Sequence, residues 1–200
     1  MVSFKSYQTY LIVVVLVVAL VGASFVFGDL DFFPDTSEKF SEFWLLDADR
    51  MTESYPFNVS SGDSYSVFVD VANQMGSSQQ YRVYAKFRDS NQSVLERNTG
   101  LPSSSSPLYE FEFSVEDEEV WESAVNFGFQ GVSVEEDVLT VGDVIINGVV
   151  HSVDASTNWN STRNGFYFEL FFELWRYDVE VESYSYTDLS LGLWLNMTSS

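Results

Sequence analysis

Apolar and polar residues alternate along much of the chain beyond residue 40. In YRVYAKFR, residues 81–88, every second residue is aromatic or aliphatic, and most of the others are charged. The segment LYEFEFSV, residues 108–115, keeps the same period, with two glutamates on its polar side. Since successive side chains of a strand point to opposite faces, this period predicts strands with one buried face and one face in water.

Further segments rich in aromatic and β-branched residues follow at short intervals. They predict additional strands at residues 40–47, 63–73, 124–132, 144–150, 165–181 and 187–198. Asn147-Gly148 lies between two apolar pairs, and both residues accept positive φ, which predicts a tight hairpin. No segment beyond Phe27 keeps a helical period for three turns, although residues 116–124 suit one helical turn. The expected fold is all-β, an Ig-like antiparallel β-sandwich of two packed sheets.

One N-terminal segment differs from this pattern, because Leu11 to Phe27 contains no charge over 17 residues. A transmembrane helix needs roughly 17 to 25 such residues. Lys5 precedes the segment and Asp29 follows it, so the positive-inside rule predicts a cytoplasmic N-terminus. The expected domains are a cytoplasmic start at 1–9, a transmembrane signal anchor at 10–28, a linker at 29–39 and an extracellular β-sandwich at 40–198.

A cleavable signal peptide is the rival interpretation of the same segment. Val21-Gly22-Ala23 supplies the small residues that signal peptidase requires. Cleavage after Ala23 would release the domain as a secreted protein. Either interpretation exports residues 40–198 from the cytoplasm.

Composition narrows the function classes. The formal net charge is −21, with 30 acidic residues against 9 basic ones, which disfavours binding to nucleic acid. Such acidity suits solubility in a salty habitat, or the attraction of cations and basic partners. The chain has no cysteine, so disulfides, thiol chemistry and cysteine-ligated zinc are excluded.

Residues suited to catalysis are few and scattered. His151 is the single histidine, and no sequence around a particular serine supports a triad with it. On a strand, Glu169 and Glu173 would lie about 13 Å apart, beyond the spacing of a glycosidase carboxylate pair. We expect them on an outward, solvated stripe balanced by Arg176. No catalytic residue is therefore predicted, and a carboxylate-based hydrolase is the least favoured class.

Metal and cofactor motifs are also missing from the sequence. The acidic runs at 116–119 and 135–137 lack the spacing of a calcium loop. No phosphate-binding or dinucleotide-binding glycine motif occurs. The prediction is no cofactor and no metal.

Four sequons fit N-x-[ST] on the exported side, which predicts N-glycosylation at Asn58, Asn91, Asn160 and Asn196.

The exposure of the tryptophans should distinguish two possible roles of the domain. Trp44, Trp159, Trp175 and Trp194 should be largely buried in a structural or interaction module, whereas two or more of them exposed on one concave face would favour sugar binding.

Several residues resemble a known family. The pattern F-x-E-F-x-L-L, then Y-P, G and N, is carried by Phe40, Glu42, Phe43, Leu45, Leu46, Tyr55, Pro56, Gly62 and Asn73. With Glu119-x-Trp121-Glu122 and the closing strands, it resembles the archaeal membrane-protein family of the domain of unknown function 1616. The resemblance implies an archaeal source and a surface location, but no activity. Three features depart from the family pattern. Asp47 stands where a glycine is usual, the segment at residues 133–165 looks longer than in the pattern, and the chain has one N-terminal membrane span where the family has several.

These observations predict a membrane-anchored module of an archaeal cell envelope with a structural or protein-interaction role. Its expected partners are the membrane, through the N-terminal helix, and an envelope protein or glycan. The alternative is an adhesive surface module that binds carbohydrate or cations.

Overall fold

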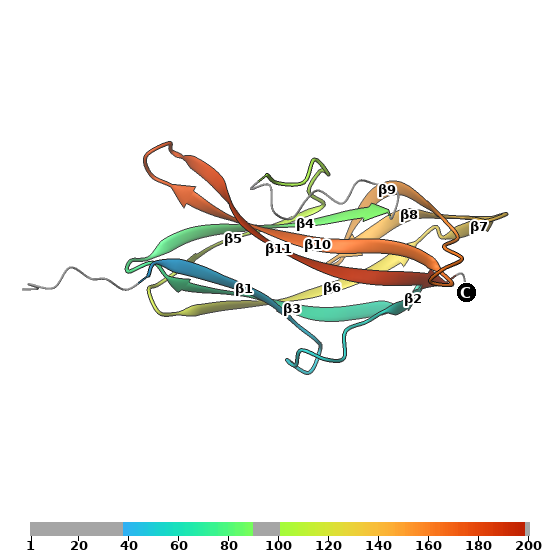
Figure 1. The fold of residues 1–200 in the computed structure, drawn as a ribbon, viewed down its shortest axis with the longest axis horizontal. Helices are drawn as coiled ribbons and strands as arrows, with labels where there is room; N and C mark the ends of the chain where they lie inside the picture. The colour runs from blue at the N-terminus through green and yellow to red at the C-terminus, as the bar shows by residue number, and fades with distance from the viewer. Residues whose placement is uncertain (1–37, 90–100, 199–200) are drawn as a thin grey trace, which may run out of the picture. The chain divides into compact units, whose positions relative to one another are not determined.

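The computed structural model describes residues 38–89 and 101–198, and all strands and turns discussed below lie in these ranges (Figure 1). Eleven strands are present there: β1 Phe40–Leu46, β2 Asn58–Ser60, β3 Ser64–Gln74, β4 Gln79–Asp89, β5 Tyr109–Val115, β6 Val120–Gln130, β7 Ser133–Glu135, β8 Val138–Ile146, β9 Val149–Asn158, β10 Phe166–Asp178 and β11 Ser183–Thr198. The predicted all-β class is confirmed. The one helical turn considered at 116–124 is wrong, because Val120 already begins β6.

The strands form two sheets that lie as layers over one another (Figure 1). Sheet A has the order β1-β3-β6-β8-β7, with β9 on the other edge of β8. Sheet B has the order β2-β11-β10-β4-β5. All neighbouring strands are antiparallel except β2 and β11, whose pairing is parallel. The expected antiparallel arrangement therefore holds for every described pair but this one.

The core lies between the inner faces of the two sheets. Alternate residues of β4 point into it, and Tyr81, Val83 and Ala85 are fully buried as the alternation predicts. Val67, Val69 and Val71 of β3 oppose them from sheet A within one apolar cluster. Burial of apolar surface at roughly 25 cal/mol per Å² is the main stabilising term for such a sandwich.

The part of the outer face of sheet B that lies over the first nine residues of β10 is buried, although its polar residues suggested a solvated face. Every residue of β10 from Phe166 to Leu174 is buried, on both faces of the strand. We call residues 101–107 the strap; its Ser103 N–H donates to Glu173 Oε1 at 2.6 Å, and Lys86 Nζ donates to the Ser103 carbonyl at 3.0 Å (Figure 1). The prediction of a solvated stripe at Glu169 and Glu173 is wrong. The strap covers Glu173, and the two carboxylates pair with Arg88 and Lys86 of β4.

Two turns show how local sequence sets the backbone. Asn147 and Gly148 have φ of 48° and 80° and join β8 to β9, so the predicted hairpin is confirmed. Asp47 follows β1, and its Oδ1 accepts hydrogen bonds from the N–H groups of Asp49 and Met51. Its Oδ2 accepts one from Ser54. The residue that departs from the family pattern thus organises the loop after β1.

The described strands all belong to one unit, Lys39–Ser200. The predicted cytoplasmic start at 1–9, the anchor at 10–28 and most of the linker at 29–39 lie outside the described residues. Within 38–89 and 101–198, no helix is long and apolar enough to cross a membrane.

Candidate functional site

The hairpin of β10 and β11 carries a bulge that separates its end from the rest of sheet B. Leu174 pairs with Leu189, but the next residue, Trp175, pairs with Tyr186, so β11 has two extra residues. One of them, Thr187, donates from its hydroxyl to the Leu174 carbonyl at 2.8 Å. Bulges bend a strand and increase its twist. The hairpin end accordingly turns out of the plane of the sheet (Figure 1).

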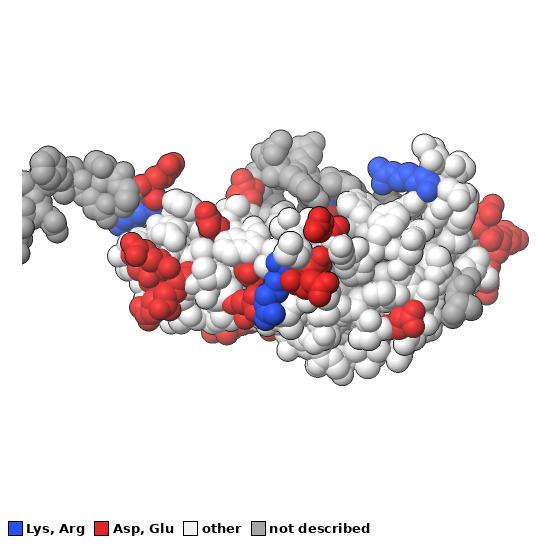
Figure 2. Space-filling model, turned by 90° about the horizontal axis from the view of Figure 1, so that it is seen from below, with Lys and Arg blue, Asp and Glu red and all other residues white. Residues whose placement is uncertain are grey.

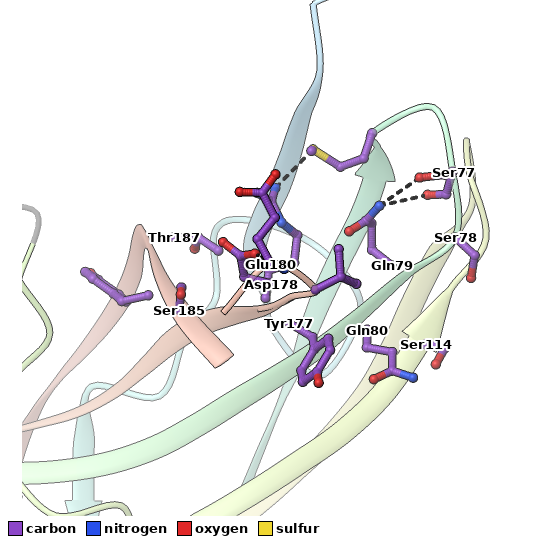
Figure 3. A pocket seen from close by; sticks show the side chains of 14 residues that line it. Ser77, Ser78, Gln79, Gln80, Ser114, Tyr177, Asp178, Glu180, Ser185 and Thr187 are labelled. Atoms are coloured by element: carbon purple, nitrogen blue, oxygen red, sulfur yellow. Dashed lines mark hydrogen bonds between the residues drawn. The ribbon is translucent and has the colours of Figure 1, made fainter. Parts of the chain in front are cut away.

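A groove of about 960 Å³ lies beneath this hairpin end (Figure 3). One wall is the β3–β4 turn with the start of β4, through Met75 and residues 77–80. The other wall is the hairpin, through residues 176–180 and 185–187, and Ser114 of β5 completes the lining. We call this the end groove. It joins segments about a hundred residues apart in the sequence.

The lining of the end groove is polar. It contains serine and threonine hydroxyls, two glutamine amides, two tyrosines, one guanidinium and two carboxylates. Some of these groups already have partners: Gln79 Nε2 donates to Ser77 Oγ at 2.9 Å, and Asp178 Oδ1 accepts from the Glu180 N–H at 2.8 Å. Arg176 donates to Met75 Sδ at 3.1 Å and forms no ion pair within the described part of the chain. The predicted balance of Glu169 and Glu173 by Arg176 is therefore wrong.

Aromatic residues cover the outer face of sheet B beside this groove. The Trp175 and Tyr186 ring centroids are 5.8 Å apart, and those of Tyr177 and Tyr184 are 5.4 Å apart in a T-shaped arrangement. Tyr84 meets the edge of Trp175 at 5.6 Å. We call these five residues the aromatic row. All five are half-buried, so the row is part of the surface.

Arg82 joins the aromatic row to the acidic edge strand β5. Its guanidinium lies 4.0 Å from the Tyr184 ring centroid, and its Nε is 2.9 Å from Glu110 Oε1. Glu112 accepts a second bond from the same guanidinium. Burial, and then the negative charge of Glu112, raise the pKa of Tyr184. This part of the surface therefore combines tyrosine, tryptophan and an oriented arginine.

The residues that were considered for catalysis, and not predicted to be catalytic, do not come together. Glu169 accepts from Arg88 Nε at 2.6 Å, and Glu173 Oε2 is 2.8 Å from Lys86 Nζ, so each carboxylate has its own base. His151 lies on β9 opposite Val144, away from the end groove. No three histidine, aspartate or glutamate side chains among the described residues are close enough to hold a metal ion.

Sheet A carries a buried carboxyl that the sequence did not reveal. Asp70 of β3 lies between Trp44 of β1 and Glu122 of β6 in one cross-strand row. Burial, and then the charge of Glu122, raise the pKa of Asp70 to about 6, although Trp44 donates to it and Arg50 is nearby. Arg50 Nη2 is 2.8 Å from Glu122 Oε1, and its guanidinium lies 4.3 Å from the Phe68 ring centroid.

The outer surface of this sheet bears few basic groups. Figure 2 shows acidic side chains at both ends of the face and a further group of them near its middle, beside a basic side chain. The acidic residues are thus spread along this face rather than confined to its ends.

The sequons occupy different environments. Asn91 lies outside the described residues. Asn58 is exposed, and its Oδ1 accepts from Asn196 Nδ2 at 2.9 Å. Asn196 Oδ1 also accepts from the Phe166 N–H at 3.2 Å, so both ends of its amide are engaged. Asn160 Oδ1 accepts from two N–H groups of its own turn, at 3.1 and 3.0 Å.

The tryptophans fit neither expected extreme. Trp159 is 40% exposed, and Trp44, Trp175 and Trp194 are half-buried. Only Trp175 belongs to the aromatic row. The sequence did contain a signal for the row, because Trp175 and Tyr177 are followed across a polar turn by Tyr184 and Tyr186 at the same spacing of two.

Likeness to solved structures is weak. The β-glucosidase from Listeria innocua in complex with gluconolactone aligns at 13% identity and a TM-score of 0.31, over 82% of this chain and 18% of that one. The ASH/PapD-like domain 7 of human CEP192 aligns at 6% identity and a TM-score of 0.31, over 86% of this chain and 96% of that one. This chain thus spans less than a fifth of the glucosidase. Scores of this size do not establish a shared fold.

No curated protein matches the chain. A family match does exist, to the domain of unknown function (DUF1616), and it covers residues 34–136. The match confirms the resemblance in the sequence of β1, the following loop and β3. Because it spans more than half of the 200 residues, the chain belongs to the family of the domain of unknown function 1616.

Proposed function

We propose that the chain is a membrane-anchored module of an archaeal cell envelope, with its β-domain outside the cytoplasm and a structural or protein-interaction role. The observation that carries the interaction role is the half-exposed aromatic row with Arg82 beside it. Tyrosine, tryptophan and arginine are the residues that dominate binding energy at protein interfaces. The ordering of Arg82 by Glu110 and Glu112 reduces the entropy lost when a partner binds.

Capture from native membranes tests this role. The tagged full chain is cross-linked in its host membranes and its partners are identified by mass spectrometry. Tyr184→Ala removes the ring beneath Arg82, and Trp159→Ala is the matched control, an exposed aromatic outside the row. The proposal expects one envelope component whose recovery falls with Tyr184→Ala and persists with Trp159→Ala. Equal recovery with both variants, or no partner at all, contradicts it.

The location is proposed from the N-terminal segment. The uncharged stretch at 10–28, with Lys5 before it and Asp29 after it, supports one span with the N-terminus inside. External protease on intact cells should remove a C-terminal tag and spare an N-terminal one. A mature protein that begins at Ser24 would instead identify a secreted form, and a fully protected C-terminus would contradict export.

We also propose that the sandwich is Ig-like. Three strands in the order β1-β3-β6 oppose four in the order β5-β4-β10-β11, as in immunoglobulin-related sandwiches. The parallel pairing of β2 with the last strand supports the same relationship. On this view β7, β8 and β9 are an insertion that extends sheet A, in the region where the sequence looked longer than the family pattern.

A second candidate function is adhesion through carbohydrate. The end groove favours it, because its lining is made of hydrogen-bonding side chains with two tyrosines. Cation binding has less support, since the described residues bring no three carboxylates together.

A further inference from the structure

We propose that the end groove binds a neutral saccharide, in the size range of one to three sugar units. This inference rests on the proposed function in one respect, that the domain meets glycans outside the cytoplasm. It adds the site, the chemical class of ligand and the side chains that recognise it.

The first argument is the hydrogen-bonding capacity of the groove. Gln80 and Ser114 are cross-strand partners on β4 and β5, and both line the groove. In the described part of the chain neither side chain has a protein hydrogen-bond partner. An amide and a hydroxyl each donate and accept, and this matches sugar hydroxyls, which do both. Asp178 adds carboxylate acceptor capacity on the opposite wall.

The second argument is the position of Tyr177. In Figure 3 its side chain lies next to that of Gln80, with Ser114 close by. The ring meets Tyr184 with an interplanar angle of 72°. A T-shaped pair leaves each ring at least one face that its partner does not cover. An uncovered ring face beside an amide and a hydroxyl can stack on the C–H face of a pyranose while its hydroxyls bond to the side chains.

The third argument is charge. The lining contains one guanidinium, that of Arg176, and two carboxylates, those of Asp178 and Glu180. The whole chain carries −21, so an anionic ligand would be repelled both by the groove and by the field around it. The described residues bring no three carboxylates together, which disfavours a metal ion. Neutral ligands remain, and the guanidinium of Arg176 has further N–H groups, besides the one that donates to Met75 Sδ, for a hydroxyl or ring oxygen.

The fourth argument concerns polarity. Met75 and Val179 are the aliphatic members of the lining, and the other side chains carry polar groups. An apolar ligand or lipid chain would have to strip water from those groups without replacing its hydrogen bonds, which is unfavourable. A polyol replaces them. Because the groove is open and offers few contacts, we expect weak binding, with Kd on the order of 1 mM.

Saturation-transfer NMR on the full chain in nanodiscs tests the inference. The probes are mannotriose, cellotriose and triacetylchitotriose, and trigalacturonate is the anionic counterpart. At least one neutral trisaccharide should receive saturation from the protein, and the effect should be strongest at a discrete set of its ring protons. Trigalacturonate should give none. No signal from any neutral probe, or a preference for trigalacturonate, overturns the inference.

Two variants locate the binding. Tyr177→Ala and Gln80→Ala should each weaken it at least about tenfold, the loss of one stacking or bidentate contact. Trp159→Ala, an exposed tryptophan outside the groove, should leave it unchanged. Circular dichroism of each variant confirms folding. Undiminished binding in a folded Tyr177→Ala or Gln80→Ala protein contradicts the assignment to the end groove.

The outcomes separate this inference from the proposed function. Cross-linking to an envelope protein, with no saccharide binding, removes the inference and leaves the protein-interaction role. Saccharide binding by a chain whose C-terminus is protected inside the cell would support the site and contradict the proposed location.

Discussion

Lys86 of β4 and Glu173 of β10 form an ion pair on sheet B, with Nζ 2.8 Å from Oε2, although their side chains are only 4% and 2% exposed. The strap supplies the remaining partners, because Ser103 donates its N–H to Glu173 and accepts from Lys86. Removing two charges from water costs several kcal/mol per ion unless pairing and hydrogen bonds replace the lost hydration. The pair is therefore complete only when the strap is in place.

Breaking this pair should destabilise the domain. Lys86→Met leaves the buried carboxylate of Glu173 without its base, and we expect a loss of about 3–5 kcal/mol in the free energy of unfolding. The double variant Lys86→Met/Glu173→Leu removes both charges and should recover most of that loss. Denaturant titration of the full chain in detergent measures both. A double variant that is no more stable than the single one would contradict the account.

Asp70 should make the domain less stable as the pH rises. Its folded pKa is about 6, above the ordinary 3.8, so the folded state binds more protons than the unfolded state between these values. The free energy of unfolding therefore falls as pH rises from about 4 to about 6, by up to about 3 kcal/mol in total.

Asp70→Asn should abolish this fall. The neutral amide still accepts from Trp44, so the variant should exceed the parent in stability at pH 7 and match it near pH 4. Glu135→Gln, an exposed acid on β7, serves as the control and should keep the parental profile. Thermal denaturation across pH 4 to 7 measures the three proteins, and a parental profile in Asp70→Asn would show that another group is responsible.

Asp47 should control the loop after β1 through two separate oxygens. Asp47→Asn retains one oxygen that accepts from the N–H groups of Asp49 and Met51. It replaces the other oxygen, which accepts from the Ser54 N–H, with an amide NH2 group that cannot accept. Hydrogen exchange should therefore accelerate at Ser54 alone. Asp47→Ala should accelerate it at all three positions. Equal exchange in the two variants would mean that packing, not the carboxylate, holds the loop.

Glycan occupancy should differ among the sequons. Asn196 donates its Nδ2 to Asn58 and accepts from Phe166, so attaching a glycan would disrupt the pairing of β2, β10 and β11. Asn160 uses only its Oδ1 in its turn within the described part of the chain. Glycopeptide mass spectrometry of protein from the native host should find a glycan at Asn160 and none at Asn196. Full occupancy at Asn196 would contradict this prediction.

The sequence by itself determined the features that repeat locally. The period of two in YRVYAKFR placed Tyr81, Val83 and Ala85 in the core, and Asn147-Gly148 fixed a hairpin through its positive φ. Strand period and turn conformation depend on neighbouring residues, so a linear pattern contains them. The family pattern around β1 and β3 was equally local.

Tertiary structure alone decided what covers each strand and where a site forms. Glu169 and Glu173 look like a solvated stripe until Arg88, Lys86 and the strap are brought over β10. The end groove depends on the bulge after Leu174, which aims Tyr177 across the start of β4. Coverage and concavity arise between segments far apart in the chain, and the polarity of a single residue does not reveal whether its charge meets water or a buried partner.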